Sequence, residues 1–234
     1  MAGFELRIVE AGDERLPCVV RGPGGARRLL IVPPLFEEMN RSRRLMALAG
    51  EALAQRGVET VLSDLPGTGD HDEPAAAMDW MRWRGAVAAL ATAVGARATL
   101  ALRGGALLDD AAGERPRYRL APVAGAALLR DLLRARAAVD TETGGAMTVA
   151  GLEAALADGQ TVEAAGYALA PALASALRGA APAPPRPGDR TAALGEADGA
   201  DVALPGPPPW RAAEAVAIDQ LAQRLAADVD AWLR

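Results

Sequence analysis

Lysine is missing from this sequence of 234 residues, in which all 25 basic side chains are arginine. Cysteine and histidine each occur once, as Cys18 and His71. A lone cysteine excludes an intrachain disulfide and a cysteine-based metal cluster, and we expect neither a metal nor a cofactor. Cys18 lies in an apolar segment, where we expect a buried and inert thiol.

Long apolar runs and an excess of positive charge are also missing. No run approaches the roughly 18–20 residues that span a bilayer, and the N-terminus lacks the hydrophobic region of a signal peptide. A net charge of -5 argues against a nucleic-acid partner, which would need a basic face. We therefore expect a cytoplasmic protein with no membrane span and no nucleic-acid partner, while the composition leaves the oligomeric state open.

The most informative stretch that is present runs from residue 29 to residue 70. It begins with a short apolar run typical of a strand buried on both faces, and two prolines end that run because they cannot donate to a sheet. An amphipathic helix is expected from near Ser42, with Gly57 at its left-handed C-terminal position. A second strand and a glycine turn follow, at residues 58–63 and 64–70. Strand, helix, strand with short connections predicts a parallel βαβ unit, and these two strand exits are typical of the α/β-hydrolase fold.

The rest of the chain continues the same alternation. We expect a leading hairpin at 4–9 and 17–21, a helix capped by Asp79, further strands at 98–102, 118–123 and 202–204, an almost entirely helical stretch at 126–178, and a terminal helix that begins at Trp210 and carries Ala213, Ala217, Leu221, Leu225, Val229 and Trp232 on one stripe. The predicted fold is thus a mostly parallel central sheet with helices on both faces. The expected parts are the N-terminal core (1–125), a helical cap insertion (126–180), a Pro/Gly-rich connector with a degenerate late strand (181–209) and a C-terminal core helix (210–234).

The catalytic nucleophile of a hydrolase fold is missing from its usual place. That nucleophile sits on a sharp turn between a strand and a helix, with small residues two positions away on either side. Here Ala101 and Gly105 supply the small residues, but the central position is Arg103, which is no acyl-transfer nucleophile. The late loop before the terminal helix contains no histidine. A Ser-His-Asp triad in its usual chain order is therefore excluded.

Four segments resemble one family within this fold. Residues 33–44 read Pro-Pro-Leu-Phe-Glu-Glu-Met-Asn-Arg-Ser-Arg-Arg, which is similar to the Pro-Pro-Phe-x-Glu-Glu-Met-Asn-Lys-Ser-Arg-Arg signature of the exosortase A system-associated hydrolase 2 family. Residues 64–70, 102–108 and 165–173 match the same family in order. The resemblance implies an α/β-hydrolase fold and a genomic link to exosortase sorting and exopolysaccharide production, but no substrate. It also implies that arginine at the elbow is a family trait, whereas the 179–209 region departs from the family.

Each candidate site residue has two interpretations. Glu37 and Glu38 are either a charge run favoured by the helix dipole or part of a site in the loop that usually contributes an oxyanion-hole amide. A desolvated Arg103 needs a carboxylate or a substrate anion, and either glutamate is near by analogy with the fold; the alternative is a purely structural ion pair. Asp70 and His71 are accessory candidates, although the simpler expectation is that Asp70 braces its turn and His71 is solvated. The four tryptophans, at 80, 83, 210 and 232, are expected in the core.

Two functions remain open. In the first, the chain is a hydrolase of an ester, thioester or glycan-linked group, in which Glu37 or Glu38 acts as base on a water. The backbone N–H groups of Leu35 and Gly104 would then bind the oxyanion, with Phe36 beside them. In the second, slightly favoured, function the protein is catalytically silent and Arg103 anchors an anionic small molecule, or a glycan- or lipid-linked ligand, under the cap.

Overall fold

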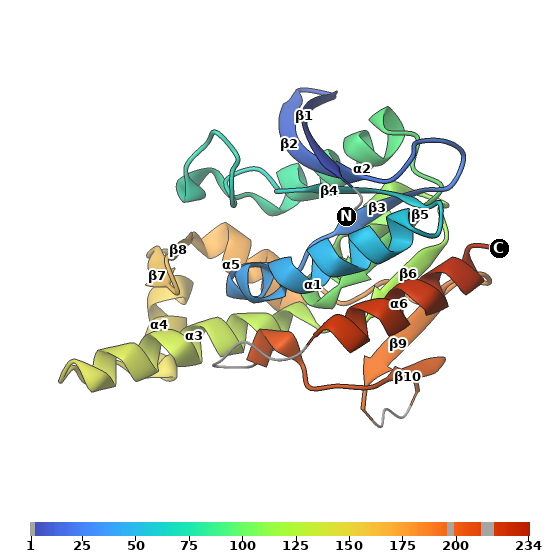
Figure 1. The fold of residues 1–234 in the computed structure, drawn as a ribbon. Helices are drawn as coiled ribbons and strands as arrows, with labels where there is room; N and C mark the ends of the chain where they lie inside the picture. The colour runs from blue at the N-terminus through green and yellow to red at the C-terminus, as the bar shows by residue number, and fades with distance from the viewer. Residues whose placement is uncertain (1–2, 196–198, 212–217) are drawn as a thin grey trace.

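The computed structural model describes residues 3–195, 199–211 and 218–234 (Figure 1). One sheet of eight strands runs through it in the order β1-β2-β4-β3-β5-β6-β9-β10. The strands are β1 (Phe4–Ala11), β2 (Glu14–Arg21), β3 (Arg28–Val32), β4 (Glu59–Ser63), β5 (Ala98–Leu102), β6 (Arg117–Leu120), β9 (Arg190–Leu194) and β10 (Val202–Leu204). Pairing is parallel from β4 to β10, and β1 and β2 form an antiparallel hairpin attached to β4.

Helices cover both faces of the sheet (Figure 1). They are α1 (Glu37–Ala54), α2 (Trp80–Ala93), α3 (Gly125–Glu142), α4 (Val149–Ala157), α5 (Pro171–Gly179) and α6 (Asp219–Trp232), with short 3₁₀ turns η1 (Ala75–Ala77), η2 (Arg103–Leu107), η3 (Asp109–Ala112) and η4 (Pro209–Arg211). The alternation along β3 shows how the two faces are filled, because Leu29 and Ile31 pack with α1 and α6 whereas Leu30 and Val32 pack with α2, α3 and α5. The central sheet is thereby buried on both sides, as its apolar strands predict.

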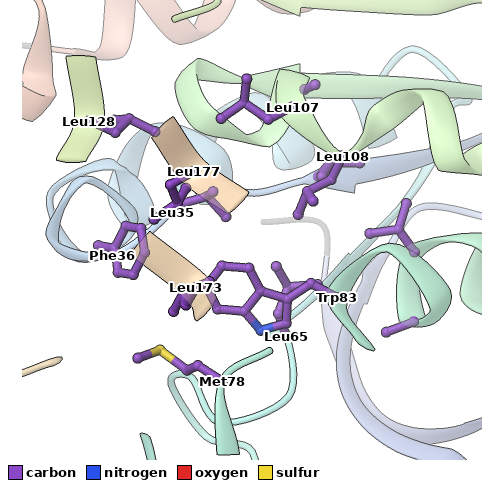
Figure 2. Close-up of a cluster of buried hydrophobic side chains, with 14 of the residues drawn as sticks. Leu35, Phe36, Leu65, Met78, Trp83, Leu107, Leu108, Leu128, Leu173 and Leu177 are labelled. Atoms are coloured by element: carbon purple, nitrogen blue, oxygen red, sulfur yellow. The ribbon is translucent and has the colours of Figure 1, made fainter. Parts of the chain in front are cut away.

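Figure 2 shows part of the second of these cores, where the helices after β6 meet the sheet. Leu128 of α3 and Leu173 and Leu177 of α5 share one apolar cluster with Phe36 and Trp83. Trp83 is fully buried and donates its indole N–H to the carbonyl oxygen of Pro66 at 2.8 Å. The segment predicted as a cap thus packs directly against the elements that end at the carboxyl edge of the sheet.

The central strands and the leading hairpin confirm the prediction. The four expected strands are neighbours in one sheet, and Asp79 caps α2 by accepting the backbone N–H of Arg82 at 2.8 Å. Gly57 has φ 75°, as its C-terminal position after α1 requires. Buried Cys18 also agrees, since burial raises the pKa of its thiol to about 11.

Several boundaries differ from the prediction. Helix α1 begins at Glu37 rather than near Ser42, because the first-turn acids Glu37 and Glu38 suit the helix dipole and Ser42 is buried inside the helix. The stretch at 126–178 is interrupted by a hairpin of β7 (Val162–Ala164) and β8 (Tyr167–Leu169), whose alternating burial is that of strands.

The late part of the chain also departs from expectation. Strand β9 lies within the region predicted as a connector and pairs with β6, so the degenerate region still completes the sheet. Trp210 belongs to the 3₁₀ turn η4, and helix α6 begins only at Asp219. Ala213 and Ala217, which the sequence pattern predicts on the terminal stripe, lie outside the described residues. Across residues 3–195, 199–211 and 218–234, no helix is long and apolar enough to cross a membrane.

Candidate functional site

The turn after β5 has the backbone of a nucleophile elbow. Arg103 follows the last residue of the strand, adopts the left-handed φ of 51° and opens η2. Such a conformation is strained for a residue with a side chain and marks a site that the surrounding structure holds in place. Gly105 permits the turn because a Cβ there would lie 2.6 Å from the carbonyl oxygen of Pro33 at the end of β3. The fold thus presents residue 103 where a hydrolase presents its nucleophile.

The side chain of Arg103 pairs with Glu38, the second residue of α1. Its Nη2 lies 2.8 Å from Oε1 of Glu38, and its Nε lies 3.1 and 3.2 Å from the two carboxylate oxygens. The two side chains are only 10% and 17% exposed. Burial raises the pKa of Glu38, and the hydrogen bonds and charge of Arg103 oppose that rise. The proximity predicted for Arg103 and one of the two glutamates is present, and Glu38 is the partner.

Two further contacts hold the Arg103 side chain. Its Nη1 donates to the carbonyl oxygen of Ala121 at 3.3 Å, just beyond β6. Its guanidinium also lies over the indole ring of Trp210, 4.9 Å from the ring centroid, within the range of a cation–π interaction. Trp210 is buried, but it is part of this site rather than only core. Its signal in the sequence was its position on the late loop, where a triad histidine is expected.

The loop between β3 and α1 lies against the elbow. A Cβ on Gly104 would lie 3.1 Å from Cγ of Leu35 and 2.5 Å from Cδ1 of Leu128. Leu35 and Gly104, the two residues predicted to donate to an oxyanion, are therefore close together beneath the Leu128 side chain of α3. Phe36 has a positive φ of 58° and stacks edge-on against Trp83 and Tyr167, which fixes the entry into α1.

A cavity of about 170 Å³ opens beside this cluster. Its wall is formed by α1, α3, the turn of the β7–β8 hairpin and η4. The lining residues are Leu35, Phe36, Glu37, Glu38, Arg41, Leu128, Asp131, Leu132, Ala135, Ala165, Trp210 and Arg211. A second hollow of about 480 Å³ shares four of these residues, Glu37, Arg41, Ala135 and Ala165. The sequence did not indicate Asp131 or Arg211 as site residues, because only the approach of α3 and η4 to α1 brings them together.

Glu37 faces this cavity without contacting Arg103 among the described hydrogen bonds. Its carboxylate is 41% exposed and accepts from Arg41 one turn later at 3.3 Å. The two adjacent glutamates therefore have different environments: Glu38 is desolvated and paired with the elbow, whereas Glu37 is at the mouth of the cavity.

Asp70 and His71 are not among the residues that line this cavity. Asp64, rather than Asp70, braces the glycine turn, because its Oδ2 accepts the backbone N–H of Asp70 at 2.9 Å. His71 is not solvated as expected: its side chain is 5% exposed, and its Nε2 lies 4.0 Å from Glu14. Contacts between the turn and β2, which are distant in sequence, bury it.

Comparison with solved structures identifies the architecture. Epoxide hydrolase A from Mycobacterium thermoresistibile is similar over 99% of this chain and 98% of its own, with a TM-score of 0.57 and 17% sequence identity. The fold is the α/β-hydrolase fold. A proline iminopeptidase-related protein from Thermus thermophilus is similar over 82% of this chain and 80% of its own, with a TM-score of 0.52 and 18% identity. No protein-family model and no curated protein sequence matches the chain.

Proposed function

We propose that this chain is a ligand-binding α/β-hydrolase-fold protein of the exosortase- and exopolysaccharide-associated type, and that it does not hydrolyse through a Ser-His-Asp triad. One observation carries the proposal: the elbow holds Arg103, engaged by Glu38 and by Trp210 from the late loop. Arginine cannot act as an acyl acceptor, and a tryptophan donates but does not exchange a proton near neutral pH. The elbow thus holds an arginine in place of a nucleophile, and the late loop, where a triad base would be sought, supplies the tryptophan over which that arginine lies.

The shape and lining of the cavity support a ligand with an apolar part and a charged or hydroxylated part. Leu35, Leu128, Leu132 and Trp210 form an apolar wall, and the charged residues include acids and arginines. A cavity of about 170 Å³ is smaller than the ~300–1,000 Å³ typical of small-molecule sites, so it holds one end of a ligand while the adjoining hollow accommodates more. This arrangement suits a small molecule or a glycan- or lipid-linked group. The segment at 126–180 then acts as the cap.

Tryptophan fluorescence tests binding directly, with alkyl phosphates and alkyl carboxylates of increasing chain length as probes. We expect a saturable change in the emission of the native chain, and we expect Trp210→Phe to remove it. Trp80→Phe is the matched control, because Trp80 lies on α2 and does not line the cavity. No saturable response to any probe, or an identical response in Trp210→Phe, would contradict binding at this cavity.

A hydrolase remains the second candidate, because burial raises the pKa of Glu38 and so favours a carboxyl that can accept and release a proton. Fluorophosphonate labelling and a panel of short-chain p-nitrophenyl esters decide between the two. We expect no covalent label and no turnover above that of the Arg103→Met variant. Turnover that is lost in Glu38→Gln and kept in Glu37→Gln would establish the hydrolase, and a label on a serine would overturn the catalytically silent interpretation.

A further inference from the structure

Among residues 3–195, 199–211 and 218–234, none pairs with the outer edge of strand β1, which leaves the hydrogen-bonding edge of the sheet open. It is the first strand in the sheet order, spans eight residues and pairs with β2 on one side. The opposite edge strand, β10, has three residues. A long unpaired edge is a template for pairing with another chain, and in Figure 1 this edge is at the far end of the molecule from β9 and β10.

One face of β1 is apolar and exposed. Phe4, Leu6 and Ile8 alternate along the strand and are 60%, 71% and 54% exposed. The register continues this face across the sheet, since Leu6 is paired with Val19 and Val19 with Leu62, and both are half-buried. A hollow of about 370 Å³ lies on the same face and is lined in part by Leu6 and Ile8. An apolar stripe beside an open edge is typical of an interaction surface.

The other face of β1 carries a pair of opposite charges at its exposed end. Glu5 and Arg7 are 59% and 49% exposed, and Arg7 Nε donates to Glu5 at 2.6 Å. The two charges are symmetric about Leu6. This symmetry matters because an antiparallel strand pair built from two copies of one chain is self-complementary.

We propose that β1 pairs antiparallel with β1 of a second copy, with Leu6 opposite Leu6 on a two-fold axis perpendicular to the sheet. In this register Glu5 faces Arg7 of the second copy on one face, twice, and Phe4 faces Ile8 on the other. Opposite charges and apolar side chains that face each other directly stabilise a sheet. The two sheets then become one continuous sheet across the dimer.

The charges select this register over its neighbours. In an antiparallel pair, directly opposed side chains lie on the same face of the sheet. An alternative register must therefore shift one strand by two residues relative to the other. Such a shift in one direction places Glu5 opposite Glu5, and a shift in the other places Arg7 opposite Arg7. Like charges directly opposite each other destabilise the pair. Charged residues on an edge strand can also prevent pairing with another chain. For that function alone, it would not matter which of positions 5 and 7 carries the negative charge and which the positive charge.

Charge reversal at positions 5 and 7 tests whether these charges select the dimer register or prevent edge pairing. We expect the native chain to sediment with a mass that rises with concentration towards twice its 24.0 kDa. Glu5→Arg and Arg7→Glu should each raise the dimer dissociation constant by about tenfold or more. The double swap Glu5→Arg/Arg7→Glu should restore it, and an equimolar mixture of the two single variants should form heterodimers, because the mixture pairs each arginine with a glutamate. All of these side chains are exposed, so circular dichroism should show unchanged folding.

A cross-link tests the register itself. Opposed residues in an antiparallel pair have Cα atoms about 4.5–5.5 Å apart, within the disulfide range, and the native Cys18 is buried. Leu6→Cys should therefore form a disulfide-linked dimer on mild oxidation, whereas Ile8→Cys should cross-link only when mixed with Phe4→Cys. A native chain that stays monomeric throughout the micromolar range, single charge variants that dimerise as the native chain does, or equal cross-linking of Ile8→Cys alone would overturn the proposal.

Discussion

Two arginine clusters on neighbouring strands show how the same side chain serves different ends in this fold. Arg103, at the end of β5, pairs with Glu38 beside a cavity, and both side chains retain some contact with solvent. Arg119, on β6, forms two hydrogen bonds of 2.7 Å with Asp109, and the carboxylate of Asp109 is wholly enclosed. Arg117 pairs with Asp189, to whose Oδ2 its Nε donates at 2.8 Å, and the side chains of both residues are at most 3% exposed.

The enclosed cluster explains how the proline-rich connector is held. Arg119 donates to the carbonyl oxygen of Ala183 at 2.5 Å, and Arg117 donates to that of Pro184 at 2.8 Å. An extended proline-rich segment cannot pair its backbone as a strand does, so buried arginines supply the missing donors. In the open cluster of Arg103, Glu38 and Trp210, the guanidinium instead lies over an aromatic ring, and Glu38 and Trp210 line the cavity. The described partners of Arg103 are protein groups too, but two of them, Glu38 and Trp210, line the cavity, whereas no residue of the enclosed cluster does.

The largest expected effect is on the enclosed cluster. Asp109→Asn leaves the guanidinium of Arg119 without its counter-charge, and we expect the free energy of unfolding to fall by about 3–5 kcal/mol. Chemical denaturation measures the loss. The exposed pair of Glu10 and Arg15 is the control, since Glu10→Gln should change stability by less than about 0.5 kcal/mol. Equal effects of the two variants would remove the distinction between enclosed and open ion pairs.

The backbone that presents Arg103 is tested by two neighbouring glycines. Gly105→Ala forces a methyl group against the carbonyl oxygens of Val32 and Pro33, which cannot move without disturbing β3, and should cost about 3 kcal/mol or more. Gly104→Ala meets chiefly the end of the Leu128 side chain, which can rotate, and should cost about 1 kcal/mol. Thermal unfolding compares the two variants. If Gly104→Ala were the more harmful, the close approach at Gly105 would not be what holds the elbow.

The open cluster should show a smaller loss with a specific rescue. Arg103→Met leaves Glu38 desolvated and should lower the free energy of unfolding by about 1–3 kcal/mol. Adding Glu38→Gln should recover much of this loss, because charges in contact are not additive, whereas adding Glu37→Gln should recover none. Melting temperatures of the single and double variants measure the coupling. Additive effects in both double variants would defeat the assignment of Glu38 as the partner.

The smallest expected effect is a difference between the two clusters in how stability depends on pH. Burial raises the pKa of Glu38 above 4.5, so its contribution to stability is present at low pH and falls as the pH rises through the raised value. Desolvation of Asp189 is outweighed by hydrogen bonds from Arg117 and from backbone N–H groups, which lower its pKa below 3.8, so its contribution is present above 3.8 and is lost as the pH falls. Relative to the native chain, Glu38→Gln should become more stable with rising pH and Asp189→Asn less stable. Unfolding free energies across the acidic range should give slopes of opposite sign, and parallel slopes would contradict the prediction.

The contrast also shows where sequence patterns stop being informative. The run at 29–32 predicted a strand buried on both faces because every residue there is apolar, and β3 is such a strand. The strand at 190–194 was missed because its residues are half-polar and lie among prolines and glycines, and its identity depends on its pairing with β6. Glu37 and Glu38 were equivalent in the sequence, since both are first-turn acids, and only the position of Arg103 distinguishes them.

The sequence by itself determined the βαβ repeat, the sharp turn after β5, the arginine on that turn and the lack of a triad histidine, because these follow from local periodicity, backbone freedom and residue identity. The tertiary structure decided which glutamate pairs with Arg103, that Trp210 covers it and that His71 is buried. Each of these depends on the approach of segments that are distant along the chain. Desolvation and side-chain contacts arise only when such segments pack together, and the local sequence pattern does not specify that packing.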